Sequence, residues 1–405
     1  MGYQPKYAPQ KKKGSSGAAV VLALLLVPLS LFCTGKLLSF LYHTPGEEIQ
    51  AMTEPMKTPD MSISEQIGDF ASIQLQNAEA ALDGVLHETQ PPETEPPRLI
   101  TPIPADAQMG PKPDSTKYGQ VQNPADMESV LKDAAFLLKD DPMYFSTSAE
   151  LFADTPVRYY LDDSIFAVTW KEAHDKSVYT FSEVKIADPS QLRRHLSDGA
   201  FGSGKLYYPT EMAQTVNAVV ATSGDFYANR PAFGIMAYEG QVKRSVEVAY
   251  AETCYIDDKG DMIFSYMKEL PTQKEAQAFL DEHNINFSLA FGPILVDNYQ
   301  VRELPNVYGV GEIREEYARA ALCQMAPLHY LVVVANWEGD QPDDPTVERF
   351  QKVVAATGCK MAYCLDGGQT ATVIMDGELI NRPAKGEQRR ISDIVYFATA
   401  IPEGG

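Results

Sequence analysis

Tyr363–Pro383, YCLDGGQTATVIMDGELINRP, is the stretch from which the fold can be worked out. An apolar run, Met361–Leu365, ends at Asp366-Gly367-Gly368, and the following run, Thr372–Ile380, is divided by Asp376-Gly377, a two-residue type I′ hairpin signal. The pattern predicts a buried strand, a tight turn and a hairpin. The turn places one carboxylate beside two residues without Cβ, so backbone N–H groups can approach a ligand closely. We expect this turn to suit an anionic group or a sugar.

These residues resemble the phosphodiester glycosidase family, whose mammalian member removes N-acetylglucosamine from a phosphodiester and whose bacterial relatives are envelope proteins. The family pattern runs Asn-Leu-Asp-Gly-Gly-Gly-Ser-Ser, then a hairpin, then Asn-Arg-Pro. The chain keeps Leu365 to Gly368 and Asn381-Arg382-Pro383, but it has Cys364 for Asn, Gln369 for the third Gly and Thr370-Ala371 for the two Ser. The combination is more specific than Asp-Gly-Gly alone, because turns use Asp and Gly everywhere.

A second block, Asn217–Arg244, resembles the family's Ala-Ile-Asn-Gly-Asp-Tyr-Tyr followed by Arg and a Gly-containing strand. Ser223 replaces the family's Asn, and the matching residues are Gly224, Asp225, Phe226, Tyr227, Arg230 and Gly234. Three more blocks resemble the family in the same order along the chain. They are Phe291–Asn298, Tyr317–Ala321, in which the family's Arg is retained as Arg319, and Glu387–Phe397, which is similar to the family's closing Arg-x-Ile-Ser-Asp strand. The resemblance covers about Tyr144 to Ile401.

The resemblance implies a site for a sugar phosphodiester. Cleavage requires a group that neutralises the non-bridging oxygens, a proton donor to the leaving oxygen, and a positioned water or a nucleophile. The catalytic candidates are Asp366, as acid/base or nucleophile, and Arg319, as a bidentate phosphate clamp. The substrate-binding candidates are Ser223, Gly224, Asp225, Arg230, Gly367, Gly368, Thr370, Asn381, Arg382 and Arg389.

Structural roles compete with these assignments. Without the family resemblance, Asp366 would be interpreted as a turn carboxylate that caps the following amides. A structural role explains Asp225 equally well, and Arg382 could equally form a surface ion pair. Asn381 would satisfy backbone groups at the end of the hairpin. The departures at Ser223, Gln369 and Thr370-Ala371 fall inside the site blocks. They keep open a second function, that of an inactive domain that binds envelope glycan.

The charge is strongly acidic and unevenly distributed. The 405 residues carry a formal net charge of −21, which argues against nucleic acid, because nucleic-acid binding needs a basic face. Residues 1–17 hold four lysines and no acid, which leaves 30 basic and 55 acidic residues in the rest of the chain. We expect residues 1–17 to be a cytoplasmic basic tail.

Residues 18–42 are predicted to be a transmembrane signal anchor. Gly14 to Gly35 holds no charged residue, and these 22 residues would span about 33 Å as a helix, close to the hydrocarbon core of a bilayer. Lysines before this segment place the N-terminus in the cytoplasm and the main domain outside it. A cleaved signal peptide is the alternative, but no small-x-small site follows the apolar run, and Leu37–Tyr42 prolongs it.

Residues 43–122 are predicted to be a largely disordered stalk or linker, and residues 123–405 the extracellular domain. Thr89–Pro113 is proline-rich and is typical of a stiff spacer. Met61–His87 is either a stalk helix or a mobile tether.

The domain is expected to be α+β, with mixed β-sheets, hairpins and several helices. Helices are predicted from Asn123 to about Leu138, from Thr272, where a capping box begins, to about His283, and after Asp344-Pro345. Another helix is predicted over Gln191–Leu196, opened by Asp188-Pro189, with its arginines on a solvated face. The predicted strands include 157–160, 164–169, 178–186, 218–221, 233–238, 241–243 and 328–335.

No cofactor is indicated, and the metal requirement stays unknown, with a divalent cation not excluded. The cysteines and histidines show no metal-ligand spacing, and Cys254, Cys323, Cys359 and Cys364 are expected to be buried free thiols. The sequence therefore predicts a membrane-anchored hydrolase of glycosyl phosphodiesters in cell-envelope polysaccharide or teichoic-acid-like polymer, with the inactive glycan-binding or exopolysaccharide-assembly protein as the alternative.

Overall fold

The structure is a computed structural model, and it describes residues 100–401 apart from 140, 153–155, 175, 230–232, 247–250, 267–269, 271, 306–313 and 338–343. The predicted basic tail, the anchor at 18–42 and most of the linker lie outside these ranges. Inside them, no helix has both the length and the apolar character needed to cross a membrane.

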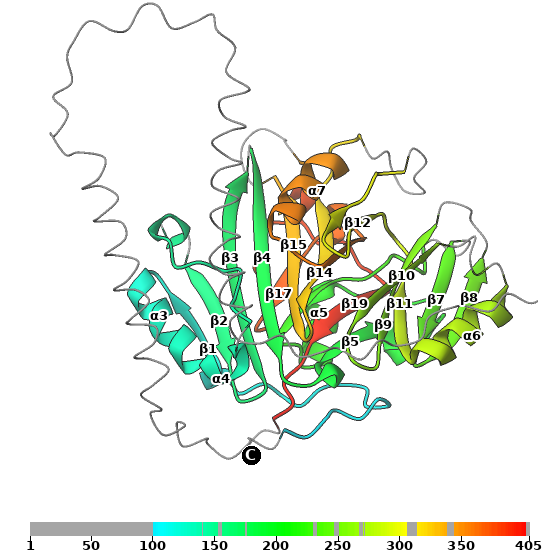
Figure 1. Cartoon of the computed structure of the whole chain (residues 1–405), viewed down its shortest axis with the longest axis horizontal. Coiled ribbons are helices and arrows are strands. Elements are labelled where there is room, and N and C mark those ends of the chain that lie inside the picture. The colour runs from blue at the N-terminus through cyan, green and yellow to red at the C-terminus, as the bar shows by residue number, and fades with distance from the viewer. Residues whose placement is uncertain are drawn as a thin grey trace, which may run out of the picture. The chain divides into compact units, whose positions relative to one another are not determined.

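The largest sheet has nine strands and contains the strand that ends at Asp366. Its order is β1 (Tyr118–Val121), β2 (Val157–Leu161), β3 (Ile165–His174), β4 (Ser177–Ile186), β15 (His329–Asn336), β14 (Arg319–Ala326), β16 (Met361–Leu365), β12 (Ile294–Asp297) and β13 (Gln300–Val301). Figure 1 shows its long central strands, β3, β4, β15 and β14, side by side.

Two five-stranded sheets complete the β-structure, and all the strand pairings in the described residues are antiparallel. One sheet runs β10 (Met262–Tyr266), β9 (Glu252–Asp257), β11 (Ile285–Leu289), β7 (Gly234–Tyr238) and β8 (Gln241–Val246). The other, which we call the β6 sheet, runs β18 (Glu378–Leu379), β17 (Val373–Met375), β6 (Val220–Ser223), β19 (Asp393–Phe397) and β5 (Leu192–Leu196).

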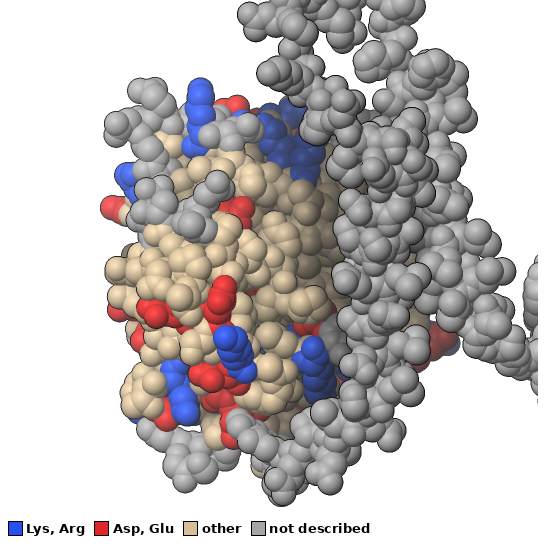
Figure 2. Space-filling model, turned by 60° about the vertical axis from the view of Figure 1, so that its left-hand side comes forward, with Lys and Arg blue, Asp and Glu red and all other residues tan. Residues whose placement is uncertain are grey.

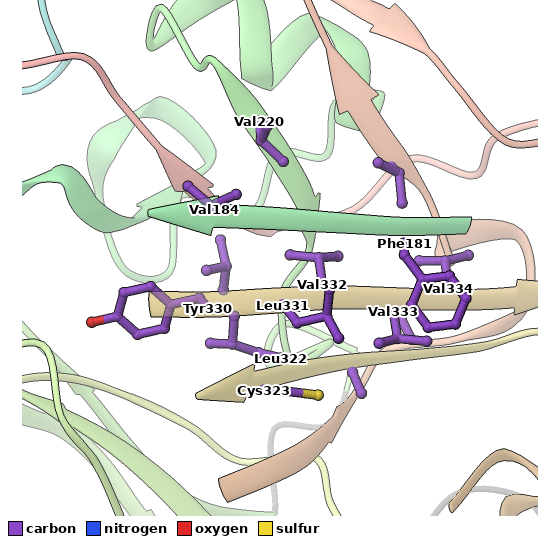
Figure 3. Packing of buried hydrophobic residues seen from close by; sticks show 14 of the residues in the cluster. Phe181, Val184, Val220, Leu322, Cys323, Tyr330, Leu331, Val332, Val333 and Val334 are labelled. Atoms are coloured by element: carbon purple, nitrogen blue, oxygen red, sulfur yellow. The ribbon is translucent and has the colours of Figure 1, made fainter. Parts of the chain in front are cut away.

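The core lies where the nine-stranded sheet packs against the other two. Every residue of β15 is buried, as expected for a central strand that is covered on both faces and therefore reads as a continuous apolar run. Figure 3 shows side chains of β4, β15 and β14 packed together, and Val220 of the β6 sheet belongs to the same core cluster. The end of β6 and the end of β16 meet through hydrogen bonds, and the candidate site lies there.

The helices are α3 (Pro124–Asp133), α4 (Ala135–Leu138), α5 (Pro209–Thr215), α6 (Gln273–His283) and α7 (Val347–Ala356). Helix α5 packs on the β6 sheet, α6 packs on the sheet of β7 and β11, and α7 lies beside β12. The N-cap side chains of α3, α6 and α7 (Asn123, Thr272 and Thr346) accept hydrogen bonds from the first turn, which satisfies amides that have no partner inside a helix.

The α+β class, the hairpins and three of the predicted helices are confirmed, whereas the helix over Gln191–Leu196 is wrong. Asp188 does cap a short 3₁₀ turn, Pro189–Gln191, but the chain then forms β5 and pairs with β19. The side chain of Arg194 in this strand is fully buried instead of solvated. Pairing with the last strand of the chain overrides the local helix signal, because a strand position is set by distant residues.

The folded unit begins earlier than the predicted boundary at Asn123. Strand β1 (Tyr118–Val121) pairs with β2, and Ile103 is buried in the cluster formed by α5 and the β6 sheet. The predicted linker over 43–122 therefore overlaps the folded unit, because residues 100–122 contribute a strand and core contacts.

The prediction about the cysteines and the distribution of charge can also be compared with the structure. The cysteines of the described part, Cys254, Cys323, Cys359 and Cys364, are free and buried, as predicted. On the face drawn in Figure 2, basic and acidic side chains are interspersed among uncharged ones. The acidic excess of the sequence therefore does not give this face a single sign of charge.

Candidate active site

The candidate site is built around Asp366, the residue that follows β16. Its backbone N–H donates to the carbonyl of Gly224 at 2.9 Å, and the Ser223 hydroxyl donates to its carbonyl at 2.7 Å. Ser223 ends β6, so these two bonds join the nine-stranded sheet to the β6 sheet at one point. Asp366 and Gly224, which lie in two separate blocks of the sequence, are thus in direct contact. These two hydrogen bonds fix the backbone of Asp366, so its carboxylate can keep one orientation toward a ligand.

The glycines after Asp366 are required by close packing and by backbone geometry. A Cβ on Gly367 would lie 2.4 Å from the carbonyl oxygen of Ala318, and Gly368 has a φ of +63°, which glycine adopts at the lowest cost. The Gly368 amide donates to the same Ala318 carbonyl at 2.8 Å. The Gly368 amide therefore holds the turn against the residue before β14. The Gly367 amide, in contrast, has no acceptor among the described residues.

The Asp366 side chain is 7% exposed and pairs with the guanidinium of Arg389 at 3.0 Å. The pKa of the Asp366 carboxyl is raised to about 7, chiefly by burial; Arg389 and Thr370 oppose the rise, and the charges of Asp393 and Asp225 add to it. A carboxyl with a pKa near neutrality can hold a proton and release it at physiological pH, which is the property of a general acid or base.

Three charged groups, Arg194, Asp225 and Asp393, form a buried charge cluster behind Asp366. The Arg194 guanidinium lies 2.7 Å from a carboxylate oxygen of Asp225 and 2.8 Å from one of Asp393, and the side chains are 0–1% exposed. Arg194 also donates to the carbonyl of Ser288. The two carboxylates outnumber the one guanidinium, so Asp366 faces a net negative cluster when both are ionised. Burial and the neighbouring Asp225 raise the pKa of Asp393, although Arg194 lowers it.

The two acids of the cluster are saturated with hydrogen bonds. Asp225 accepts from the amides of Tyr227 and Ala290 as well as from Arg194, and Asp393 accepts from the Asp225 amide and the Ser392 hydroxyl. A Cβ on Gly224 would lie 1.7 Å from a carboxylate oxygen of Asp393, so glycine is needed for this approach. Asp225 and Asp393 therefore support the site, and Asp366 is the acid of the three with an exposed edge.

Arg319 is adjacent to the turn in the backbone, but its side chain has other partners. Its guanidinium donates to the carbonyls of Glu315 at 2.6 Å and Pro345 at 3.4 Å and lies 5.5 Å from the centre of the Tyr317 ring. The ion pair of Asp366 is with Arg389 and not with Arg319. Among the described residues, Arg389 is thus the cation placed at the carboxyl, and the role predicted for Arg319 remains a prediction.

The remaining predicted residues are divided between the turn and the hairpin. The Thr370 hydroxyl donates to the carbonyl of Gly367 at 2.6 Å. Asn381 is buried and bonds to backbone groups of Val373 and Ala371, the role that the sequence offered as its alternative. The Arg382 guanidinium lies 5.6 Å from the centre of a Trp337 ring. Arg230 lies outside the described residues.

Arg194 and Asp393 were not among the predicted site residues. Asp393 ends the closing motif Arg-x-Ile-Ser-Asp and could have been found there, since a buried strand that begins with Asp needs a partner for the charge. Arg194 had only a weak signal: it lies midway between Leu192 and Leu196, on the same face of a strand.

A cavity of about 620 Å³ lies at β5, beside the segment 103–108, and is lined in part by Arg193, Arg194, Tyr238 and Tyr396. None of the predicted site residues lines it, so the assignment rests on the geometry around Asp366. In the described part of the chain, no three His, Cys, Asp or Glu side chains are grouped so as to hold a metal ion.

Residues 216–398 match the model of the phosphodiester glycosidase family. The SPbeta prophage-derived uncharacterized protein YomE of Bacillus subtilis (strain 168) is 21% identical over 265 residues, which are 64% of this chain and 39% of YomE. The chain thus spans about two fifths of the length of this curated relative.

Two solved structures are similar at low identity. The zebrafish N-acetylglucosamine-1-phosphodiester alpha-N-acetylglucosaminidase catalytic domain, auto-inhibited by its pro-peptide, has a TM-score of 0.46 and 15% identity, over 58% of this chain and 83% of that one. A hypothetical protein from Synechocystis has a TM-score of 0.47 and 12% identity, over 60% of this chain and 64% of that one. The matched range 216–398 contains Asp225, Asp366, Arg389 and Asp393, and it belongs to the phosphodiester glycosidase family, which is a family of hydrolases.

Proposed function

We propose that this chain hydrolyses glycosyl phosphodiesters in cell-envelope polysaccharide or teichoic-acid-like polymer. The observation that carries the proposal is a buried carboxyl, Asp366, whose pKa is raised to about 7 and which is paired with a part-exposed arginine inside the range that matches the family. A hydrolase of such esters needs one proton donor and one group that neutralises the phosphate.

In the proposed reaction, the Arg389 guanidinium binds the non-bridging oxygens of the phosphodiester, because a planar fork can donate to two oxygens at once. Protonated Asp366 gives its proton to the leaving oxygen as the ester bond to that oxygen breaks. A water molecule adds its oxygen to the other fragment, and the proton that this water loses returns to the Asp366 carboxylate. The free Gly367 amide is a further donor for the phosphate, as expected for a turn without Cβ. Asp225, Asp393 and Arg194 keep Asp366 in place.

The test is an assay of the full-length protein in detergent against a panel of sugar phosphodiesters, with and without chelator. Turnover above buffer supports the proposal, and its absence over the whole panel argues for the alternative. One observation favours the alternative, an inactive glycan-binding protein. Ser223 and Thr370 depart from the family pattern, and their hydroxyls both donate to backbone carbonyls within the chain. Activity that appears only after Ser223→Asn with Gln369→Gly would show that these departures inactivated the site.

The pH dependence of turnover follows from the role of Asp366. As a general acid, Asp366 must be protonated in the free enzyme, so kcat/KM is expected to be high below about pH 7 and to fall as pH rises through that value. Initial rates over a pH series on an active phosphodiester measure this limb. A rate that instead rises through pH 7 would assign Asp366 as a base or nucleophile.

The proposed location is the cell membrane, with residues 18–42 as a single-pass anchor and the main domain outside the cytoplasm. The support is the uncharged run from Gly14 to Gly35, preceded by four lysines. Protease added to intact protoplasts is expected to digest the acidic domain. Full protection would contradict this topology, and a released form without residues 18–32 would indicate a cleaved signal peptide.

A further inference from the structure

Arg389 is held loosely compared with the other arginines near Asp366. Its guanidinium makes one polar contact among the described residues, Nη2 to a carboxylate oxygen of Asp366 at 3.0 Å, although a guanidinium has five N–H donors. The side chain is 34% exposed, and its guanidinium lies 4.6 Å from the centre of the Phe226 ring. The ring orients the guanidinium while most of its donors remain open to another partner.

The neighbouring arginines are bound by other groups. Arg194 is fully buried between two carboxylates, and the guanidinium of Arg319 donates to two backbone carbonyls. An anion that reaches Asp366 from solvent therefore meets Arg389 first. This anion and the Asp366 carboxylate compete for the same guanidinium, because both are acceptors of the kind that arginine pairs with.

The charged groups around Asp366 decide what happens when an anion takes Arg389 away from it. Asp225, after β6, and Asp393, on β19, lie behind Asp366, with Arg194 of β5 between them. Thr370 lies in the same turn as Asp366, and the guanidinium of Arg319 of β14 bonds to other groups. Arg389 is the one cation that directly contacts the carboxylate within the described residues. Without it, an ionised Asp366 would be a buried charge facing two further carboxylates, which is a costly arrangement.

We propose that Arg389 exchanges partners when an anionic phosphodiester binds, so that the guanidinium passes from Asp366 to the phosphoryl oxygens and the carboxyl takes up one proton from solvent. The binding of the substrate thereby prepares the acid that the reaction needs. The step forms one O–H bond and breaks none in the ligand. It rests on the proposed function for the class of ligand but requires no turnover.

The test uses diethyl phosphate, an unreactive diester that keeps a single negative charge around neutral pH. Calorimetric titration of the full-length protein in detergent, in two buffers with different enthalpies of ionisation, counts the protons taken up with the ligand. At slightly alkaline pH, where free Asp366 is mostly ionised, a large fraction of one proton per bound ligand is expected. At acidic pH, where Asp366 already holds its proton, the uptake should approach zero.

Three variants assign the effect to these residues. Asp366→Asn is expected to bind diethyl phosphate at least as tightly as wild type and to lose the proton uptake. Arg389→Gln should weaken binding by about tenfold or more, because it removes a charge-assisted contact. Arg390→Gln is the matched control: this exposed neighbour lies 5.0 Å from the centre of the Tyr208 ring, and its loss should change neither quantity.

The proposal is overturned if wild type does not bind the diester, if it binds without proton uptake at slightly alkaline pH, or if Arg389→Gln binds as tightly as wild type. These outcomes are independent of hydrolysis. A protein that takes up the proton but turns over no sugar phosphodiester would leave this inference standing and remove the proposed function. Turnover without linked proton uptake would do the reverse.

Discussion

Asp366→Asn is expected to keep the fold and to lower kcat on a sugar phosphodiester by at least about 10²-fold, as losses of a general acid or base do. The amide has nearly the shape of the acid and can still accept from Arg389, but it has no acidic proton to give to the leaving oxygen. Steady-state kinetics below pH 7, where wild type is most active, measures the loss. Asp376→Asn is the matched control, because it makes the same change at an exposed turn residue of the neighbouring hairpin.

The stability of the same variant separates a catalytic loss from a folding defect. The folded-state pKa of Asp366 is raised from about 3.8 to about 7, so the folded protein binds this proton more tightly than the unfolded chain does. The wild type therefore loses stability as pH rises from the lower value to the higher one and does not regain it above pH 7. Asparagine carries no charge to bury, so at pH 8 the variant should melt at or above the wild-type temperature.

Turnover that is unaffected in Asp366→Asn would contradict the catalytic assignment.

The parts of the fold that could be predicted from sequence are those with local signals. The apolar run before Asp366-Gly367-Gly368 matches β16 over its full length, Met361–Leu365, because a buried strand ending in glycines leaves few alternatives. The capping box at Thr272 and Glu275 likewise located the start of α6. In both cases the residues that define the element lie within a few positions of each other.

The parts that could not be predicted depend on contacts between distant segments. Which arginine reaches Asp366 is decided by the path of the chain between Pro383 and β19, and no residue type distinguishes Arg389 from Arg319 as a partner. The guanidinium of Arg319 instead follows its own backbone, through the carbonyls of Glu315 and Pro345. The resemblance to the family could bring the blocks together, but it could not orient the side chains within them.

Among the contacts between distant segments, those of Arg194 have the largest energetic consequence. Its neighbour Arg193 lies on the same strand and donates to the carbonyl of Ala107 and to the Tyr396 hydroxyl, whereas Arg194 lies between Asp225 and Asp393 with no exposed side-chain surface. Two carboxylates in one buried site repel each other, and the guanidinium between them offsets this repulsion. The buried charge cluster therefore connects β5 and β19 with the residues that follow β6.

Arg194→Met is therefore expected to lower the free energy of unfolding by about 3–5 kcal/mol, because it leaves two buried carboxylates without their cation. Urea denaturation at neutral pH, followed by circular dichroism, measures the change. Arg158→Met is the matched control: Arg158 pairs with Glu378 at the surface, where the two side chains are 36% and 63% exposed, so its loss should change stability by less than about 1 kcal/mol.

Arg194→Lys tests the same cluster if the methionine variant does not fold. The ammonium retains the charge but cannot bond to both carboxylates and to the Ser288 carbonyl with the geometry of the guanidinium, so an intermediate loss is expected. Lowering the pH should reduce the deficit of both variants, since protonation of Asp393, whose pKa is raised by burial, removes the repulsion that the arginine had balanced. A loss in Arg194→Met no larger than that in Arg158→Met, or a deficit that grows as the pH falls, would show that the two acids do not depend on this arginine and that hydrogen bonds from the backbone suffice to hold Asp366 in place.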